Sequence, residues 1–430
     1  MNPMTQRKVE LERTIGLGTA VALYTGAVLG TGILVLPAVA AETAGPASIV
    51  AWAVLCLLSL PLALTFAALA RREPVAGGFT AYIERAFGRR WGAMAGWLFL
   101  AQVPTGSVVA GLIAGSYLAA PFGLGREGVF LIGGSLVVAA FALNLVGLRI
   151  AGAVQGLVTA GVLGLVIVIL VFAVRDVRWD AFTPFAPVGW SAVGVAATQL
   201  FWAFVGWEAI TPLAEEFRNP ERDLVRASLV SVGLVAVLYL ALAVVTIGTR
   251  AYGLGISAGL PPFALMGRNA FGASAVPIIG LAGGILTFLP LNAYVAGTSR
   301  LVYALAQAGD LPPWAGALHR RTKVPHRALL VVGAFSVAAI ALAYRYQLGI
   351  SSLLPLSTSS FIATYVMSMA AAVRLLKGVP AVLALISLVG CVVILFFVGA
   401  LVVWVATVAL ASVLYGLAVS RTKLVPPTGP

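Results

Sequence analysis

Long stretches without any charged residue alternate with short charged segments along the whole chain. Eleven of these stretches are candidates for membrane spans, at 14–41, 43–70, 91–125, 128–148, 150–174, 181–207, 227–249, 269–299, 328–344, 346–373 and 378–420. A helix of about 20 apolar residues crosses a bilayer. The last stretch has 43 residues, enough for two helices that turn near Gly399. The pattern therefore predicts an all-α membrane protein with about 12 transmembrane helices, and the absence of strand-like alternation argues against a membrane barrel.

Composition agrees with this pattern. Of the 430 residues, 61% are hydrophobic and only 10% are charged, and the mean hydropathy is +1.05, whereas a soluble domain carries about 25% charged residues. The uncharged segment 251–267 contains Pro261, Pro262 and several glycines, so we expect a loop or a partly re-entrant segment there. The charged connections are too short to hold a soluble domain, so residues 1–430 are expected to form a single transmembrane domain.

The distribution of basic residues predicts the orientation in the membrane. When the connections are assigned alternately to two sides, one side holds 21 of the 27 Lys and Arg residues and the other holds six. Cytoplasmic loops carry the excess of these residues, so both termini are expected in the cytoplasm. The membrane is expected to be the inner or plasma membrane of the cell. Topology and the lipid surface then account for the net charge of +13 without a nucleic-acid partner.

Two of the predicted helices contain residues that interrupt helices. The first stretch would reach about 42 Å as one continuous helix, which exceeds the hydrocarbon thickness, and it contains Gly26, Gly30, Gly32 and Pro37. The sixth stretch leads through Gly206 to Pro212. If 14–174 and 188–373 are two repeats, these interruptions occupy corresponding positions, as in an inverted-repeat transporter. Segment 378–420 then adds helices 11 and 12.

Unwound backbone in a bilayer is tolerated where it lines a cavity or is buried in protein. Amides of Gly30, Thr31 and Gly32 at the start of a half-helix would attract a carboxylate. Freed carbonyls near Val28, and near Trp202 and Val205 beside Gly206, suit an ammonium group. The two breaks together therefore predict a site for a zwitterion. The alternative for Gly26 and Gly30 is a helix-packing motif.

Glu208 is the acidic residue that lies inside an otherwise apolar stretch. A carboxyl buried at that depth favours its neutral form and is a candidate for loading and releasing a proton. The alternative is a neutral, hydrogen-bonded structural residue near a helix end. Trp202 could cover an amphipathic ligand, or serve only for packing.

Other polar residues inside the stretches are less specific. Gln102 and Thr105 flank Pro104, and either line a pocket or form interhelical hydrogen bonds, as we also expect of Asn144 and Asn292. The hydroxyls of Thr298 and Ser299 could bind sodium, because hard cations prefer oxygen ligands, or could likewise form hydrogen bonds.

The residues do not favour an enzyme. The two histidines, His319 and His326, lie in a charged connection, so no Ser/His or paired-Asp centre can be built inside the membrane. No nucleotide-binding Gly-x-x-x-x-Gly-Lys-Ser/Thr motif occurs. We therefore expect neither a cofactor nor a metal, and transport driven by gradients.

Several motifs resemble those of the amino acid-polyamine-organocation (APC) transporter family, along nearly the whole chain. They are GTGI at 30–33, PVAGG at 74–78, AFG at 86–88, GW at 96–97, FWAFVGWE at 201–208, EFRNPERD at 216–223 and TSRLVYA at 298–304. The stretches at Leu29 and Phe201 are most similar to the bacterial branch that exports methionine and branched-chain amino acids.

The resemblance implies a five-plus-five inverted repeat (LeuT-like) with broken helices 1 and 6. It implies that Gly30, Thr31 and Gly32 bind the substrate carboxylate, that Val28, Trp202 and Val205 bind the amino group, and that Trp202 acts as an aromatic gate. Glu208 matches a sixth-helix Glu linked to pH response or gating. The chain departs from some proton-coupled members because 150–174 contains no Lys, which removes one route of coupling.

Together these features predict a secondary transporter of neutral amino acids, with leucine, isoleucine, valine and methionine as substrates and proton-coupled export as its direction. Uptake by proton or sodium symport, and exchange, use the same machinery and stay open. So do two other classes of protein, an amino acid sensor and a channel.

Overall fold

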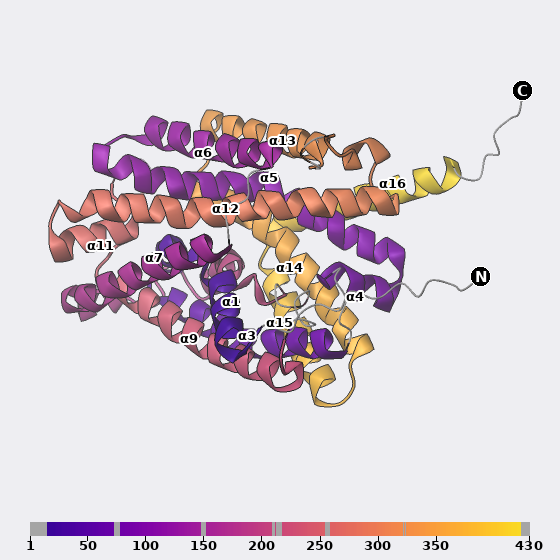
Figure 1. Ribbon diagram of the computed structural model, residues 1–430. Coiled ribbons are helices and arrows are strands. Elements are labelled where there is room, and N and C mark those ends of the chain that lie inside the picture. The colour runs from indigo at the N-terminus through magenta and orange to yellow at the C-terminus, as the bar shows by residue number, and fades with distance from the viewer. Residues whose placement is uncertain are drawn as a thin grey trace, which may run out of the picture.

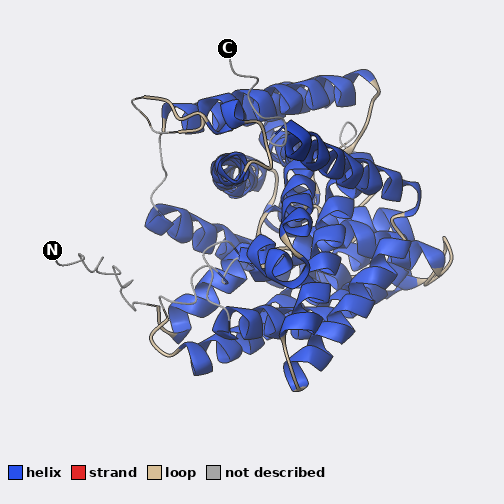
Figure 2. Ribbon diagram, turned by 90° about the vertical axis from the view of Figure 1, so that its right-hand side faces the viewer, coloured by secondary structure: helices blue, strands red, loops and turns tan. Residues whose placement is uncertain are grey.

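The computed structural model describes residues 15–72, 78–147, 152–208, 211, 217–253, 259–320, 322 and 324–422. Within these ranges the chain consists of helices and connecting loops (Figure 2), and the extended pairing is limited to one isolated parallel bridge between Ile15 and Phe217. The predicted all-α class is confirmed.

In the part of the chain that the structure describes, ten helical stretches are long and apolar enough to cross a membrane, and Leu17–Leu29 and Ser191–Phe204 are shorter apolar helices. The count of twelve and the two repeats remain predictions. The α-helices are α1 (Leu17–Leu29), α2 (Leu36–Ala44), α3 (Ser48–Arg72), α4 (Gly78–Phe87), α5 (Arg89–Ala119), α6 (Arg126–Val146), α7 (Gly152–Ala173), α8 (Ser191–Leu200), α9 (Pro220–Gly248), α11 (Pro262–Phe271), α12 (Ala275–Ala308), α13 (His326–Arg345), α14 (Ile350–Leu375), α15 (Val379–Phe396) and α16 (Val402–Thr422).

Two boundaries differ from the sequence-based expectation. The segment expected as a loop or a partly re-entrant segment at 251–267 contains the start of α11, where Pro262 occupies the first turn of a helix, a position that needs no amide donor. Helix α12 continues beyond Ser299 to Ala308 and ends at Gly309, whose φ is 78°. A charge such as Arg300 ends an apolar stretch but not a helix. The turn near Gly399 is confirmed between α15 and α16.

The helices form two groups (Figure 1). Helices α5, α6, α12 and α13 lie side by side in one group, and α3 and α9 pack together with α1, α2 and α8 in the other. Helix α14 packs against both α5 and α3. The contacting pairs α3 with α9, α5 with α12, and α6 with α13 are those that corresponding positions in two repeats would form.

Ion pairs and hydrogen bonds join helix ends that the charge pattern assigns to the same side. We call the side that holds most of the Lys and Arg residues the basic end, and the other side the opposite end. At the basic end, Arg89 at the start of α5 bonds to Asp310 at 2.8 Å, just beyond α12. At the opposite end, Arg126 at the start of α6 donates to the carbonyls of Ala343 and Tyr344 in α13, both at 3.1 Å. In Figure 1, α4 and the end of α16 lie on the right, at the basic end, and α11 lies on the left.

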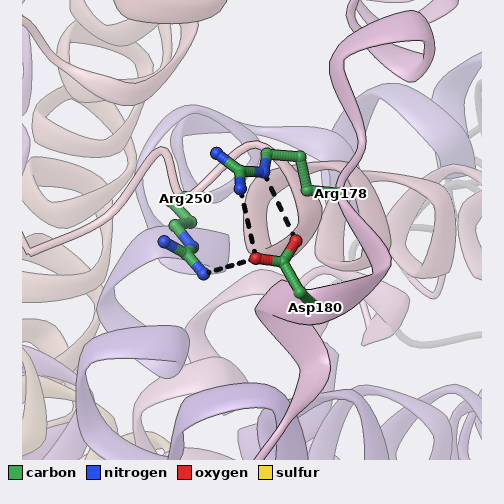
Figure 3. A network of polar contacts seen from close by, with 3 residues as sticks. All are labelled: Arg178, Asp180 and Arg250. Carbon is green, nitrogen blue, oxygen red and sulfur yellow. Dashed lines mark hydrogen bonds and ion pairs between the residues drawn. The ribbon is translucent and has the colours of Figure 1, made fainter.

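The connection between α7 and α8 bonds to the C-terminal end of α9. Asp180 accepts from Arg178 at 3.3 Å and from Arg250 at 3.2 Å (Figure 3). These side chains are exposed, so the ion pairs contribute only about 1 kcal/mol or less. The backbone adds to them, because the Arg178 amide donates to the carbonyl of Gly248 at 3.0 Å.

Helices α5 and α6 approach closely through glycines. A Cβ at Gly133 would lie 2.4 Å from the carbonyl oxygen of Gly111, and one at Gly115 would lie 2.3 Å from that of Val129. Small residues allow such backbone contact between membrane helices. Beyond these glycines, the Asn144 amide donates to Asn292 Oδ1 at 2.9 Å, so both residues form an interhelical hydrogen bond, as expected, and their partners are each other.

Gly133→Ala is expected to destabilise the fold by about 1–3 kcal/mol, because the added methyl group overpacks a backbone contact. A lower midpoint of thermal unfolding of the purified protein would report it. Gly134→Ala is the matched control, since its Cβ would meet Ile340 at an ordinary 3.7 Å. Equal midpoints for the two variants would contradict the proposed packing of α5 on α6.

Candidate functional site

The first helix is broken, as the sequence predicts. Helix α1 ends at Leu29, a short 3-10 segment follows over Thr31–Leu34, and α2 begins at Leu36 with Pro37 in its first turn. Gly30 lies between the two segments with φ −11° and ψ −145°. The amides at the start of each new segment cannot bond within their own helix, which is the property needed to bind an anionic group.

The second break begins in the sixth predicted helix. Helix α8 passes into a 3-10 segment over Phe201–Phe204, Val205 is extended, and Gly206 adopts a φ of 128° that favours glycine. Pro212, expected in this break, lies outside the described residues.

The two breaks touch each other through these glycines. A Cβ at Gly32 would lie 3.2 Å from the Cβ of Ala203, and a Cβ at Gly206 would lie 2.9 Å from the carbonyl oxygen of Ala27. By contrast, no atom lies within 4 Å of a Cβ at Gly26, and a Cβ at Gly30 would meet only its own helix at 3.9 Å. In the described residues, the Gly26-x-x-x-Gly30 sequence is therefore not a helix-packing contact.

Tyr239 of α9 joins the two breaks. Its hydroxyl lies 2.9 Å from the carbonyl oxygen of Val28 in the first helix and 2.9 Å from that of Ala203 in the second break. The side chain is fully buried and packs against Trp52 and Phe204, with ring centroids 4.8 and 5.2 Å away. One hydroxyl proton serves both carbonyls, and each retains a lone pair for a further donor.

Two other tyrosine hydroxyls bond to backbone of the breaks. Tyr117 of α5 donates to the carbonyl of Leu34 at 2.9 Å. Tyr365 of α14 accepts from the amide of Gly206 at 3.2 Å. Tyr117, Tyr239 and Tyr365 were not among the sequence candidates, because a tyrosine in an apolar stretch is equally typical of packing or of an interface.

Glu208 follows the second break directly. Its Oε2 atom accepts from the amide of Gly206 at 3.0 Å and from the hydroxyl of Tyr365. Aromatic rings of Phe66, Phe99 and Phe361 line the small pocket around it. No Lys or Arg in the described ranges forms an ion pair with this carboxyl, so its hydrogen bonds are to neutral groups.

Trp202 extends from the second break towards α5 and α14. Its ring meets that of Phe361 edge-on, with centroids 6.0 Å apart and an interplanar angle of 84°. Gly106 of α5 lies at the tip of the indole ring. The predicted gate residue therefore lies between the break and the other group of helices.

Gln102 is buried beside this aromatic pair. Ser357 of α14 lies 3.2 Å from its Oε1 atom, and its Nε2 atom donates to the hydroxyl of Tyr294 in α12. This confirms an interhelical role for Gln102. Thr105 donates to the carbonyl of Gln102 at 3.1 Å, within the same helix.

Thr298 and Ser299 are buried in α12. Their hydroxyls donate within that helix, to the carbonyls of Tyr294 and Ala296, both at 2.8 Å. Their oxygen lone pairs remain acceptors, and a sodium site there stays a prediction.

A cavity of about 240 Å³ opens at the opposite end of the molecule. It reaches Val35, where the first break ends, and its wall includes Glu42 and Arg126 together with Pro262 and Ile350.

Comparison with known proteins agrees with this architecture. A family model described as "Amino acid permease" matches residues 15–422, a range that includes both breaks. The "uncharacterized amino acid permease YecA" of Bacillus subtilis is 36% identical over 408 residues, covering 94% of this chain and 96% of the relative. The L-methionine/branched-chain amino acid exporter YjeH of Escherichia coli is 33% identical over 394 residues, covering 90% and 92%. The branched-chain amino acid permease BcaP of Bacillus subtilis is 26% identical over 351 residues, covering 77% and 75%.

Tyr239→Phe is expected to destabilise the fold by about 1–3 kcal/mol, because it leaves two buried carbonyls without their donor. The midpoint of thermal unfolding measures the loss. Tyr303→Phe in α12 is the control, since the Tyr303 hydroxyl has no hydrogen bond within the described ranges. Equal midpoints for both variants would show that the Tyr239 hydroxyl does not hold the breaks together.

Proposed function

Because this chain belongs to the amino acid permease family, we propose that it carries neutral amino acids, chiefly leucine, isoleucine, valine and methionine, across the membrane by alternating access around the two helix breaks. Membership makes it a multi-pass membrane transporter and not an enzyme. The observation that carries the finer proposal is the direct contact between the breaks, at Gly32 with Ala203 and at Gly206 with Ala27. Unwound backbone of both polarities is thereby concentrated in one small region.

This region can bind both charges of an amino acid. Amides of Gly30, Thr31 and Gly32 would hold the carboxylate, because they lie where a new helical segment begins. Carbonyls of Val28, Trp202 and Val205 would hold the ammonium group. For Val28, the Tyr239 hydroxyl takes one lone pair and leaves the other.

The neighbours of Trp202 favour an uncharged substrate side chain. Phe361 and Gly106 lie against the indole ring, Gln102 lies beside Gly106, and none of the three carries a charge. Glu208 bonds to neutral groups beside the break. The names of the exporter YjeH and the permease BcaP also indicate branched-chain substrates for those relatives.

Glu208 is the proposed site of proton coupling. Its carboxyl bonds to the Gly206 amide and to Tyr365, so a change in its protonation would alter the contacts of the second break directly. We propose that this links proton entry to export of the amino acid, with the basic end and both termini in the cytoplasm of a bacterial inner or plasma membrane. Sodium coupling through Thr298 and Ser299 is the alternative that a sodium-free assay separates.

In sodium-free proteoliposomes, we expect saturable counterflow of labelled leucine and methionine that responds to an imposed pH gradient. Gly30→Leu should lower this counterflow at least about tenfold, because a side chain would fill the space before the amides that hold the carboxylate. Gly26→Leu is the matched control, because a Cβ at Gly26 meets nothing within 4 Å. Absence of counterflow by the folded wild-type protein, or full activity of Gly30→Leu, would overturn the proposal.

Glu208→Gln should flatten the dependence of leucine transport on pH while leaving counterflow measurable at one fixed pH, because the amide cannot gain or lose a proton in this range. Rates are measured across pH 5 to 8, about the range in which coupled carboxyls act. Glu127→Gln, at an exposed position in the first turn of α6, controls for loss of a surface charge. A profile identical to that of the wild type would remove Glu208 from coupling.

A further inference from the structure

Three atoms from three helical segments converge on Gly106, in the interior of α5. A Cβ at this position would lie 3.1 Å from Cη2 of Trp202, 3.1 Å from Oε1 of Gln102 and 3.1 Å from Oγ of Ser357. The backbone at Gly106 is helical, so glycine is required here for space and not for an unusual φ. Any larger residue must displace one of these neighbours.

Two of the three neighbours are fixed by hydrogen bonds. Ser357 Oγ lies 3.2 Å from both the carbonyl oxygen and the Oε1 atom of Gln102, and Gln102 Nε2 donates to Tyr294. Gln102 and Ser357 are both fully buried. A shift of either one would strain these buried hydrogen bonds. The indole ring makes the third contact, so a Cβ at Gly106 would press on the ring as well.

The other end of the indole ring is fixed by the second break. Trp202 precedes Ala203, whose Cα would be 3.3 Å from a Cβ at Gly32 and whose carbonyl accepts from Tyr239 at 2.9 Å. The backbone of Trp202 therefore cannot retreat without disturbing the contact between the breaks. The ring spans the distance from the break to α5, and Gly106 sets how far it extends.

We propose that Gly106 is a specificity-determining residue of the amino acid site, because it fixes where the Trp202 ring rests and so limits the size of the substrate side chain beside that ring. Gly106 acts through Trp202 and is a positioning residue. The inference rests on the proposed transport function. A methyl group at position 106 either occupies the space itself or pushes the ring back towards the breaks, and both reduce the room for a branched side chain.

Counterflow of leucine and of alanine by the full-length protein in proteoliposomes tests this inference. Gly106→Ala should lower kcat/KM for leucine relative to that for alanine by about tenfold, the discrimination that one methylene group provides in a tight pocket. Combining it with Trp202→Phe, which removes the Cη2 atom, should restore the leucine-to-alanine ratio to that of Trp202→Phe alone. Gly233→Ala in α9, where a Cβ meets nothing within 4 Å, should leave the ratio unchanged.

An unchanged ratio in folded Gly106→Ala, or additive effects in the double variant, would overturn the role of Gly106 while leaving the transport function intact. If Gly106→Ala does not fold, the single variant Trp202→Phe tests whether the indole ring limits the size of the substrate side chain. Its shorter ring should raise phenylalanine counterflow relative to leucine, and an unchanged ratio overturns the inference. If the folded wild-type protein exchanges none of these amino acids, the proposed function fails and the inference fails with it.

Discussion

Unwound backbone inside a membrane must find its hydrogen-bond partners within the protein, because hydrocarbon offers none. This requirement governs the centre of the molecule, where two helices lose their regular bonding. Three tyrosines supply partners from neighbouring helices. Tyr117 binds the carbonyl of Leu34, Tyr239 those of Val28 and Ala203, and Tyr365 the amide of Gly206. Each tyrosine buries its ring in an apolar layer and presents only a hydroxyl to the break.

The same requirement brings the two breaks together. The two segments can approach each other this closely only where a side chain is missing. Gly32 and Gly206, which have no side chain, lie at the two contacts. The resulting region has amides and carbonyls close together, with tyrosine hydroxyls and the Glu208 carboxyl beside them. A ligand with two opposite charges and an apolar side chain matches this distribution, as a neutral amino acid does. The breaks therefore cost the fold regular helical hydrogen bonds, and they expose the same backbone groups that would bind such a ligand.

The two groups of helices form the two boundaries of the proposed site. One boundary is the backbone of the breaks, held by α9 through Tyr239. The other is formed by α5 and α14, with Gly106, Gln102 and Phe361 facing Trp202. Trp202 belongs to the first boundary and rests on the second, so a relative movement of the groups would move the ring. Glu208 lies next to the same break and bonds to α14 through Tyr365, which places the candidate proton site at the junction of both groups.

The sequence by itself determined the features that depend on local pattern. Runs of apolar residues defined the spans, the turn at Gly399 and the all-α class, and Gly30, Gly32 and Gly206 marked both breaks. Motifs spread along the chain identified the family. The tertiary structure alone decided which residues complete the proposed site, because Tyr239, Tyr365 and Gly106 are ordinary members of apolar helices until packing places them against a break. Their positions depend on contacts between distant segments, such as the bond between Tyr239 and Val28, which are 211 residues apart, and a pattern that repeats over a few residues carries no information about such contacts.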